Sequence, residues 1–99
     1  MPHYLVIAYD GTDAEAMDRR MAARPAHFEG MKPMVESGEV VSGGAILDDA
    51  GKMIGSAMMV NFKDRADLDA WLKRDPYVIG KVWQRIEVKP MLIAGVPVR

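Results

Sequence analysis

Hydrophobic and polar positions fall into blocks that predict four strands and two main helices. The strand blocks are rich in aliphatic, β-branched and aromatic residues, and they cover residues 4–9, 40–47, 53–62 and 82–91. Residues 14–37 and 64–74 have helical composition, and a short turn or helical piece is expected at residues 77–81. The order is βαββαβ, which predicts a ferredoxin-like α+β fold with both helices on one face of a four-stranded antiparallel sheet.

Two prolines punctuate the first helical block. We expect Pro25 to end a first piece near Ala23 and to open a second, because proline is tolerated at the first position of a helix. Gly38 is expected just beyond the end of the second piece. That piece carries one apolar stripe at helical spacing, with Pro33 off the stripe; its members are Phe28, Met31, Met34 and Val35.

Turn and cap signals mark the ends of the other elements. Thr12 or Asp13 is expected to cap the first helix and Asp64 the second. Residues 48–51, Asp-Asp-Ala-Gly, predict a hairpin turn. The pair Gly43-Gly44 inside a strand predicts a bulge or a close approach of another part of the chain.

The 99 residues suffice for one domain, residues 1–99, with an apolar C-terminal arm at residues 93–99. The sheet face without helices also carries apolar positions, and a domain this small gains by burying them against another molecule. A homodimer is therefore expected.

Composition narrows the function. The net charge is −1 and there is no basic stripe, so a nucleic-acid partner is not expected. The chain has no cysteine, no leader-like start and no apolar run long enough to cross a membrane, which predicts a cytoplasmic protein without a membrane partner. Glycine-rich nucleotide motifs and clustered metal ligands are also missing from the sequence, so neither a cofactor nor a metal is expected.

His27 is the first candidate for chemistry, because an imidazole facing a cavity can act as a general base near neutral pH. At the start of the second helical piece it would be kept neutral by the helix N-terminus. The alternative is a histidine that only bonds a backbone carbonyl. His3, near the chain start, is expected to be frayed.

Asp75 is the second candidate and also has two interpretations. In Asp75-Pro76-Tyr77 it is well placed to cap a helix that begins at Pro76. Near a histidine, the same carboxylate could orient the imidazole and fix its tautomer.

Four further residues are candidates for a substrate pocket. Arg24 could hold a carboxylate or a phenolate, or it could be a solvated cation at a helix end. The hydroxyl groups of Tyr4, Ser56 and Tyr77 could line the pocket, but each residue suits a packed strand or turn equally well.

An ordered set of short motifs resembles the YciI-like (YCII-related) proteins over nearly the whole chain. The set comprises Arg24-x-x-His27, Gly38, Gly43-Gly44 before an acidic turn, Gly55-Ser56 and Asp75-Pro76-Tyr77. The resemblance implies a ferredoxin-like domain that pairs into a dimeric α+β barrel similar to muconolactone isomerase. It also implies a His–Asp active site, which maps onto His27 and Asp75.

The resemblance implies one function and leaves a rival open. Most members of the family have no established reaction, and the precedents include dehydrochlorination of a chlorinated hydroxyhydroquinone. We therefore expect a cofactor-independent lyase or isomerase acting on a small cyclic or aromatic compound through His27 and Asp75. The alternative is a dimeric protein that binds a small molecule without chemistry. Contact between His27 and Asp75 at an open cleft would favour the enzyme.

Overall fold

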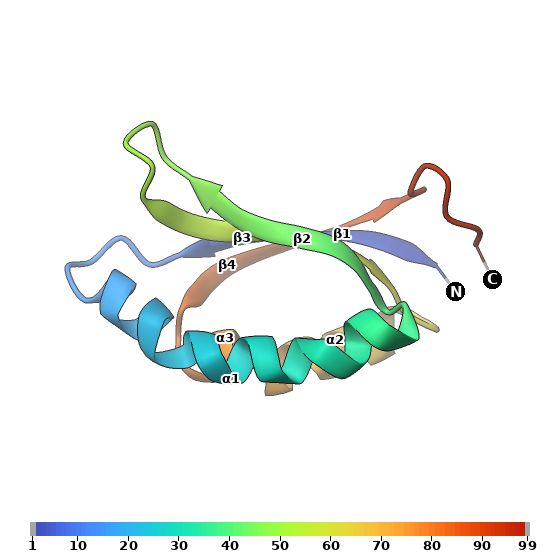
Figure 1. Cartoon of the computed structure of the whole chain (residues 1–99), viewed down its shortest axis with the longest axis horizontal. Helices are drawn as coiled ribbons and strands as arrows, with labels where there is room; N and C mark the ends of the chain where they lie inside the picture. Colours follow the sequence, from blue (N-terminus) through green and yellow to red (C-terminus); the bar gives the residue numbers. More distant parts are fainter. Residues whose placement is uncertain (1, 99) are drawn as a thin grey trace.

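The chain folds into one four-stranded antiparallel sheet with all of its helices on one side (Figure 1). The structure is a computed structural model that describes residues 2–98. The strands are β1 (His3–Asp10), β2 (Val40–Leu47), β3 (Met53–Asn61) and β4 (Trp83–Met91), in the order β2-β3-β1-β4. The helices are α1 (Ala16–Ser37), α2 (Arg65–Arg74) and α3 (Pro76–Ile79). The predicted ferredoxin-like fold class is confirmed, with α3 as a short extra helix.

Register and side-chain alternation divide the sheet into two faces. Val6 pairs with Met58 and Val88, and these residues point toward the helices. There they meet the buried core side chains of the helices, which are Met34, Leu68, Trp71, Leu72 and Tyr77. The opposite face carries half-buried apolar residues that no helix covers, namely Leu5, Ile7, Ile46, Ala57 and Met59.

Helix α1 is continuous, so the predicted break at Pro25 is wrong. A proline removes one backbone N–H and leaves the carbonyl four residues earlier without its helical partner. Pro25 and Met21 are both exposed, as are Pro33 and Glu29, so the freed carbonyls lie on the solvent side where water can bond them. His27 consequently lies in mid-helix, and the predicted effect of a helix N-terminus on its charge does not apply.

Most of the predicted ends are confirmed. Gly38 ends α1 in the left-handed conformation, with φ of 86°, and Asp64 caps α2 by accepting the Asp67 N–H at 2.9 Å. The Asp48 carboxylate accepts two backbone N–H groups in the hairpin turn. The predicted cap of the first helix is wrong, because the Asp13 carboxylate binds Arg19 instead, at 2.6 and 2.8 Å.

His3 is a second correction, because it is buried rather than frayed. Only 3% of its surface is exposed, and both ring nitrogens bond the C-terminal segment. The Ile93 N–H donates to Nδ1 at 2.8 Å, and Nε2 lies 3.3 Å from the Pro97 carbonyl oxygen, to which it donates. The imidazole thereby ties residues 93–97 of the predicted arm to the start of β1; Arg99 lies outside the described residues.

Between residues 2 and 98 no helix is long and apolar enough to cross a membrane.

Replacing His3 should free this segment. His3→Ala leaves the buried Ile93 N–H without an acceptor, so we expect the free energy of unfolding to fall by about 1–3 kcal/mol. Urea unfolding measures the loss, and amide hydrogen exchange at Ile93 locates it. The exposed arm residue Val98 provides a control, since Val98→Ala should change neither quantity. Unchanged exchange at Ile93 in His3→Ala would show that the imidazole does not hold the segment.

Candidate functional site

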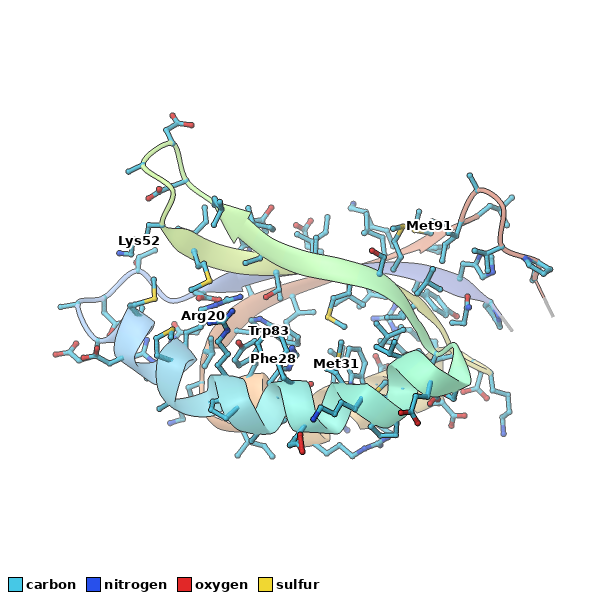
Figure 2. The ribbon with its side chains drawn as sticks, in the orientation of Figure 1. Arg20, Phe28, Met31, Lys52, Trp83 and Met91 are labelled. Carbon is cyan, nitrogen blue, oxygen red and sulfur yellow. The ribbon has the colours of Figure 1, made fainter. Side chains whose placement is uncertain are left out.

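A cleft of about 800 Å³ opens between α1 and the β2–β3 end of the sheet. Its helix wall comes from positions one to two turns apart on α1, which place Arg20, Arg24 and His27 on one face. Figure 2 shows Arg20, Phe28 and Met31 between α1 and the sheet. The apolar stripe predicted on this helix is divided, because Met34 enters the core whereas the other members line the cleft.

The opposite wall of the cleft includes a stretch of small residues on β2. Gly43 lies there on β2, and a Cβ at this position would lie 2.9 Å from the Met58 side chain and 3.0 Å from the Ala57 carbonyl oxygen. The predicted close approach at Gly43-Gly44 is therefore confirmed for Gly43. The neighbouring wall residues are also small, namely Ser42, Gly44 and Ala45.

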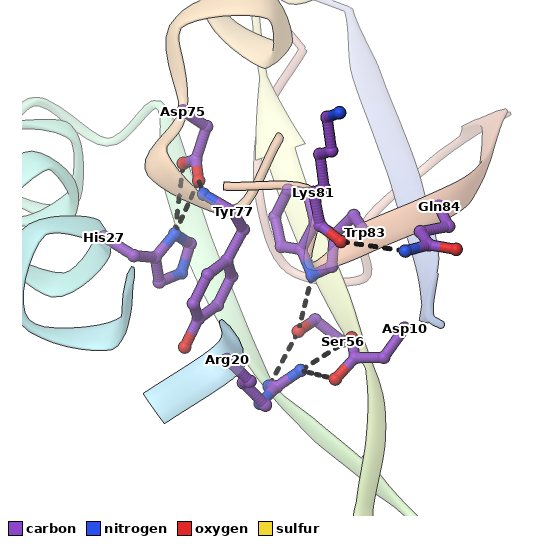
Figure 3. Close-up of polar contacts among 9 residues, drawn as sticks. All are labelled: Asp10, Arg20, His27, Ser56, Asp75, Tyr77, Lys81, Trp83 and Gln84. Carbon is purple, nitrogen blue, oxygen red and sulfur yellow. Dashed lines mark hydrogen bonds and ion pairs between the residues drawn. The ribbon is translucent and has the colours of Figure 1, made fainter. Parts of the chain in front are cut away.

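His27 lines the cleft and contacts Asp75, which is not one of the lining residues (Figure 3). His27 Nδ1 lies 2.9 and 3.1 Å from the two carboxylate oxygens, and the residues are only 5% and 4% exposed. A carboxylate accepts and does not donate, so Nδ1 carries a hydrogen, and in the neutral imidazole the lone pair is therefore on Nε2. Nε2 has no hydrogen-bond partner within the part of the chain that the structure describes. The imidazole is therefore oriented as a general base.

Asp75 also has the capping role that the sequence allowed. It stands between α2 and α3 in an extended conformation, as expected for a residue before proline, and Oδ1 accepts the Tyr77 N–H at 2.9 Å. The two interpretations of Asp75 are thus compatible, because one carboxylate serves both contacts.

Tyr77 covers one side of the imidazole. Its ring stacks on that of His27 with the centroids 3.9 Å apart and the planes at 14°, while Trp83 approaches edge-on at 5.5 Å. Burial raises the pKa of the Tyr77 hydroxyl above its usual 10.0, although the positive charges of Arg20 and Arg24 oppose the rise. This hydroxyl stays protonated at neutral pH and has no hydrogen-bond partner among residues 2–98, so it is available as a donor.

A buried polar network lies beside the stacked rings (Figure 3). Arg20 Nη1 donates to both oxygens of Asp10 at 3.0 Å, and its Nη2 donates to Ser56 Oγ at 3.0 Å. Ser56 Oγ accepts a second bond from Trp83 Nε1 at 3.2 Å. Because both partners are donors, the Ser56 hydroxyl hydrogen is free to bond an acceptor in the cleft, which Ser56 lines.

The structure gathers most of the predicted pocket residues. Arg24, Ser56 and Tyr77 line the same cleft as His27. Tyr4 does not, so its predicted place in the pocket is wrong. Tyr4 pairs with Val60 on β3. Val60 lies four residues beyond the cleft residue Ser56 on that strand, a distance of roughly 13 Å.

Asp10, Arg20 and Trp83 were missed by the sequence reasoning. The predicted break at Pro25 placed Arg20 and His27 in two separate helical pieces. In an unbroken helix the two lie seven residues apart and share a face. The seven-residue spacing was therefore the signal in the sequence that could have identified Arg20 as a neighbour of His27. No group of three or more metal-ligating side chains is present in the described part of the chain.

Comparison with known families matches the YCII-related domain over residues 2–92. The chain belongs to this family. Protein YciI of Escherichia coli is 27% identical over 92 residues, covering 87% of this chain and 94% of the relative. Derivative of benzaldehyde biosynthesis cluster protein C of Emericella nidulans is 34% identical over 85 residues, covering 78% of this chain and 87% of the relative.

Solved structures of low sequence identity share the fold of this YCII-related protein. A 5-chloro-2-hydroxyhydroquinone dehydrochlorinase from Burkholderia phenoliruptrix, in complex with 2,5-dihydroxybenzoquinone, superposes with a TM-score of 0.75 at 17% identity. The similarity covers 88% of this chain and 90% of that one. A dimeric ferredoxin-like protein of unknown function from Jannaschia superposes with a TM-score of 0.53 at 18% identity, and the similarity covers 94% of this chain and 100% of that one.

The buried hydroxyl of Tyr77 can be tested by alkaline titration. The chain has three tyrosines, and the ionisation step removed by Tyr77→Phe should lie above pH 10, because burial disfavours the phenolate. Since the pKa is higher in the folded state, the stabilisation from Tyr77 is complete below pH 10 and is lost as the pH rises through the folded value. Tyrosinate absorbance measures the step, with Tyr9→Phe as the control. If the ionisation step that Tyr77→Phe removes lies at or below pH 10, burial does not raise the pKa of this hydroxyl.

Proposed function

We propose that this YCII-related protein is a cofactor-independent lyase or isomerase for a small cyclic or aromatic compound. The observation that supports this most directly is the state of His27, which has Nδ1 bound to a buried carboxylate and Nε2 unpaired beside an open cleft. That arrangement suits a general base that takes a proton from a substrate carbon or hydroxyl.

The neighbouring groups suit the charge that such a proton transfer creates. Removing a proton leaves an imidazolium on His27, and Asp75 stabilises it across 2.9 Å. The electron pair left on the substrate moves onto an oxygen, where the Ser56 hydroxyl can donate to it. Arg20 and Trp83 polarise that hydroxyl by donating to its oxygen. The electron pair then returns from the oxygen to the carbon framework. In an elimination it breaks the bond to the leaving group, which departs with the proton from His27; in an isomerisation it forms a bond between that proton and another substrate carbon.

The relatives support a small cyclic or aromatic compound as the substrate. One structure of the same fold is a 5-chloro-2-hydroxyhydroquinone dehydrochlorinase, and one relative is named for a benzaldehyde-derivative biosynthesis cluster. The cleft has aromatic and sulfur-containing walls that suit such compounds; they include Phe28, Met31, Met53 and Met58.

A binding protein without chemistry is the second candidate. The capping bond from the Tyr77 N–H to Asp75 gives that carboxylate a structural role of its own, whatever the cleft holds. The two candidates differ in what His27 does, since only catalysis requires its free Nε2.

Turnover by His27 variants separates them. A panel of halogenated hydroxyhydroquinones and unsaturated lactones, starting with 5-chloro-2-hydroxyhydroquinone, is assayed for chloride release and absorbance change. We expect His27→Gln to lower kcat/KM about 10²–10⁴-fold while the protein stays folded. Ser56→Ala should lower kcat more than it raises KM, because its hydroxyl serves the developing oxyanion. The matched control is Asp69→Asn, which removes a carboxylate on α2 that pairs with Arg65.

Two results would contradict catalysis by His27. One is turnover that His27→Gln leaves unchanged. The other is a wild-type protein that binds members of the panel and turns none of them over, which would support the binding protein.

We also propose that a second copy of the chain covers the helix-free face of the sheet. The face has a cluster of half-buried apolar side chains around Leu5, Ile7 and Met59, and such patches usually mark an interface. The Jannaschia protein of the same fold is described as dimeric.

A charge placed on this face should separate the copies. Ile7→Lys puts an ammonium group into the proposed interface, so we expect the molar mass from light scattering to fall from that of two chains to that of one. Ala70→Lys, at an exposed position of α2, is the control. Circular dichroism verifies that both variants fold. A wild-type protein that is monomeric at tens of micromolar, or an unchanged mass in folded Ile7→Lys, would exclude this interface.

A further inference from the structure

We propose that the ligand of this cleft is a planar monocarboxylic acid whose carboxylate binds Arg24. The inference rests on the proposed function and narrows it to one chemical class of ligand. It assigns Arg24 as the residue that selects an acid over its neutral analogues.

Arg24 is the cation of the cleft lining that no carboxylate of the described residues neutralises. Arg20 is neutralised by Asp10, with both side chains about 95% buried. Lys32, a second cation of the cleft lining, pairs with Glu29 at 2.9 Å. No acidic side chain in the described residues forms an ion pair with Arg24. Glu36, the one carboxylate among the lining residues, is twelve residues further along α1, roughly 18 Å away.

Arg24 is also held in place rather than loose in solvent. It lies in mid-helix, not at a helix end, so its interpretation as a solvated terminal cation no longer applies. The side chain is half-buried, and its guanidinium carbon lies 5.0 Å from the Phe28 ring centroid. An aromatic contact of this kind limits the motion of the guanidinium and leaves its N–H groups available.

The position of Arg24 connects it to the polar end of the cleft. It precedes His27 by three residues on the same face of α1, and its positive charge opposes the rise that burial causes in the pKa of the Tyr77 hydroxyl. A ligand bound through Arg24 would therefore extend toward the imidazole and the free hydroxyls of Ser56 and Tyr77.

The geometry and the charge favour a carboxylate over other anions. A guanidinium fork bonds a carboxylate through two parallel N–H groups. One uncompensated positive charge matches one negative charge, whereas a phosphate dianion would leave a charge unpaired in a partly desolvated cleft. The exposed half of the Phe28 ring provides an apolar surface against which a flat conjugated acid can pack.

Matched pairs of acids and amides test the proposal. The probes are 2,5-dihydroxybenzoate against 2,5-dihydroxybenzamide, salicylate against salicylamide, and cinnamate against cinnamamide, with Kd measured by calorimetry. The proteins are wild type, Arg24→Gln and the control Lys32→Gln, each checked for an unchanged fold by circular dichroism. Lys32→Gln removes a cation from the same helix and the same cleft lining.

In the wild type we expect at least one acid to bind about tenfold or more tightly than its amide, as a charge-assisted pair requires. Arg24→Gln should reduce that preference to about twofold or less, by weakening the acid and not the amide. Lys32→Gln should keep the preference. Arg24→Lys should restore part of it, because it returns the charge without the planar fork.

The proposal is overturned if no acid in the panel binds more tightly than its amide, including the case in which nothing binds. It is also overturned if Arg24→Gln keeps the preference or if Lys32→Gln removes it. Failure of the proposed catalysis gives a different result: acid selectivity that depends on Arg24, together with turnover that does not depend on His27.

Discussion

Asp75 joins the junction of α2 and α3 to α1, through a contact that spans 48 residues of sequence. Its backbone N–H donates to the Leu72 carbonyl oxygen at 3.3 Å and so ends α2. Its carboxylate caps α3 and holds the His27 imidazole of α1, at distances of 2.9 to 3.1 Å. A buried carboxylate is costly unless its oxygens are bonded, so these contacts are interdependent. Pro76 contributes by holding Asp75 in the extended conformation that aims its side chain at α1. The position of the candidate base is thus fixed by the same bonds that close the helical layer.

The space between helices and sheet is divided into an apolar part and a polar part. Around Val6, Val60 and Leu68 it is an ordinary close-packed core. Toward Asp10 and Ser56 the same interface holds an ion pair, an imidazole–carboxylate pair and two hydroxyls with unused hydrogens. Core packing would gain more stability from apolar side chains there, because a buried ion pair contributes little net stability. Such local departures from packing rules are expected where a protein binds or transforms a ligand.

The sequence predicts the fold well, because its signals are local and repeated. Strand blocks, the Asp48 turn, the Asp64 cap and Gly38 each specify their own segment, and together they allow few topologies. The errors came from residues whose state depends on tertiary structure. Pro25 is a strong local breaker, but packing of α1 on the sheet and solvation of its outer carbonyls override it. His3 looked like a loose terminal residue, because its partners lie about ninety residues away.

For the site, residue chemistry suggested His27 and Asp75 separately, and the family resemblance supplied the pairing. Arg20 and Asp10 were invisible as a pair, since an arginine in a helix and an aspartate after a strand are both ordinary surface residues until the fold buries them.

The stretch of small residues in the β2 wall of the cleft has a consequence for how binding can change during evolution. Between Ser42 and Ala45 the wall presents peptide groups and almost no side-chain volume, and a Cβ at Gly43 would collide with β3. Substitution at Gly43 offers few new shapes, because a side chain there would displace Met58 or the edge strand β2. We therefore expect differences in ligand choice among YCII-related proteins with this wall to arise mainly on the facing helix, where one substitution changes both the volume and the charge that a ligand meets.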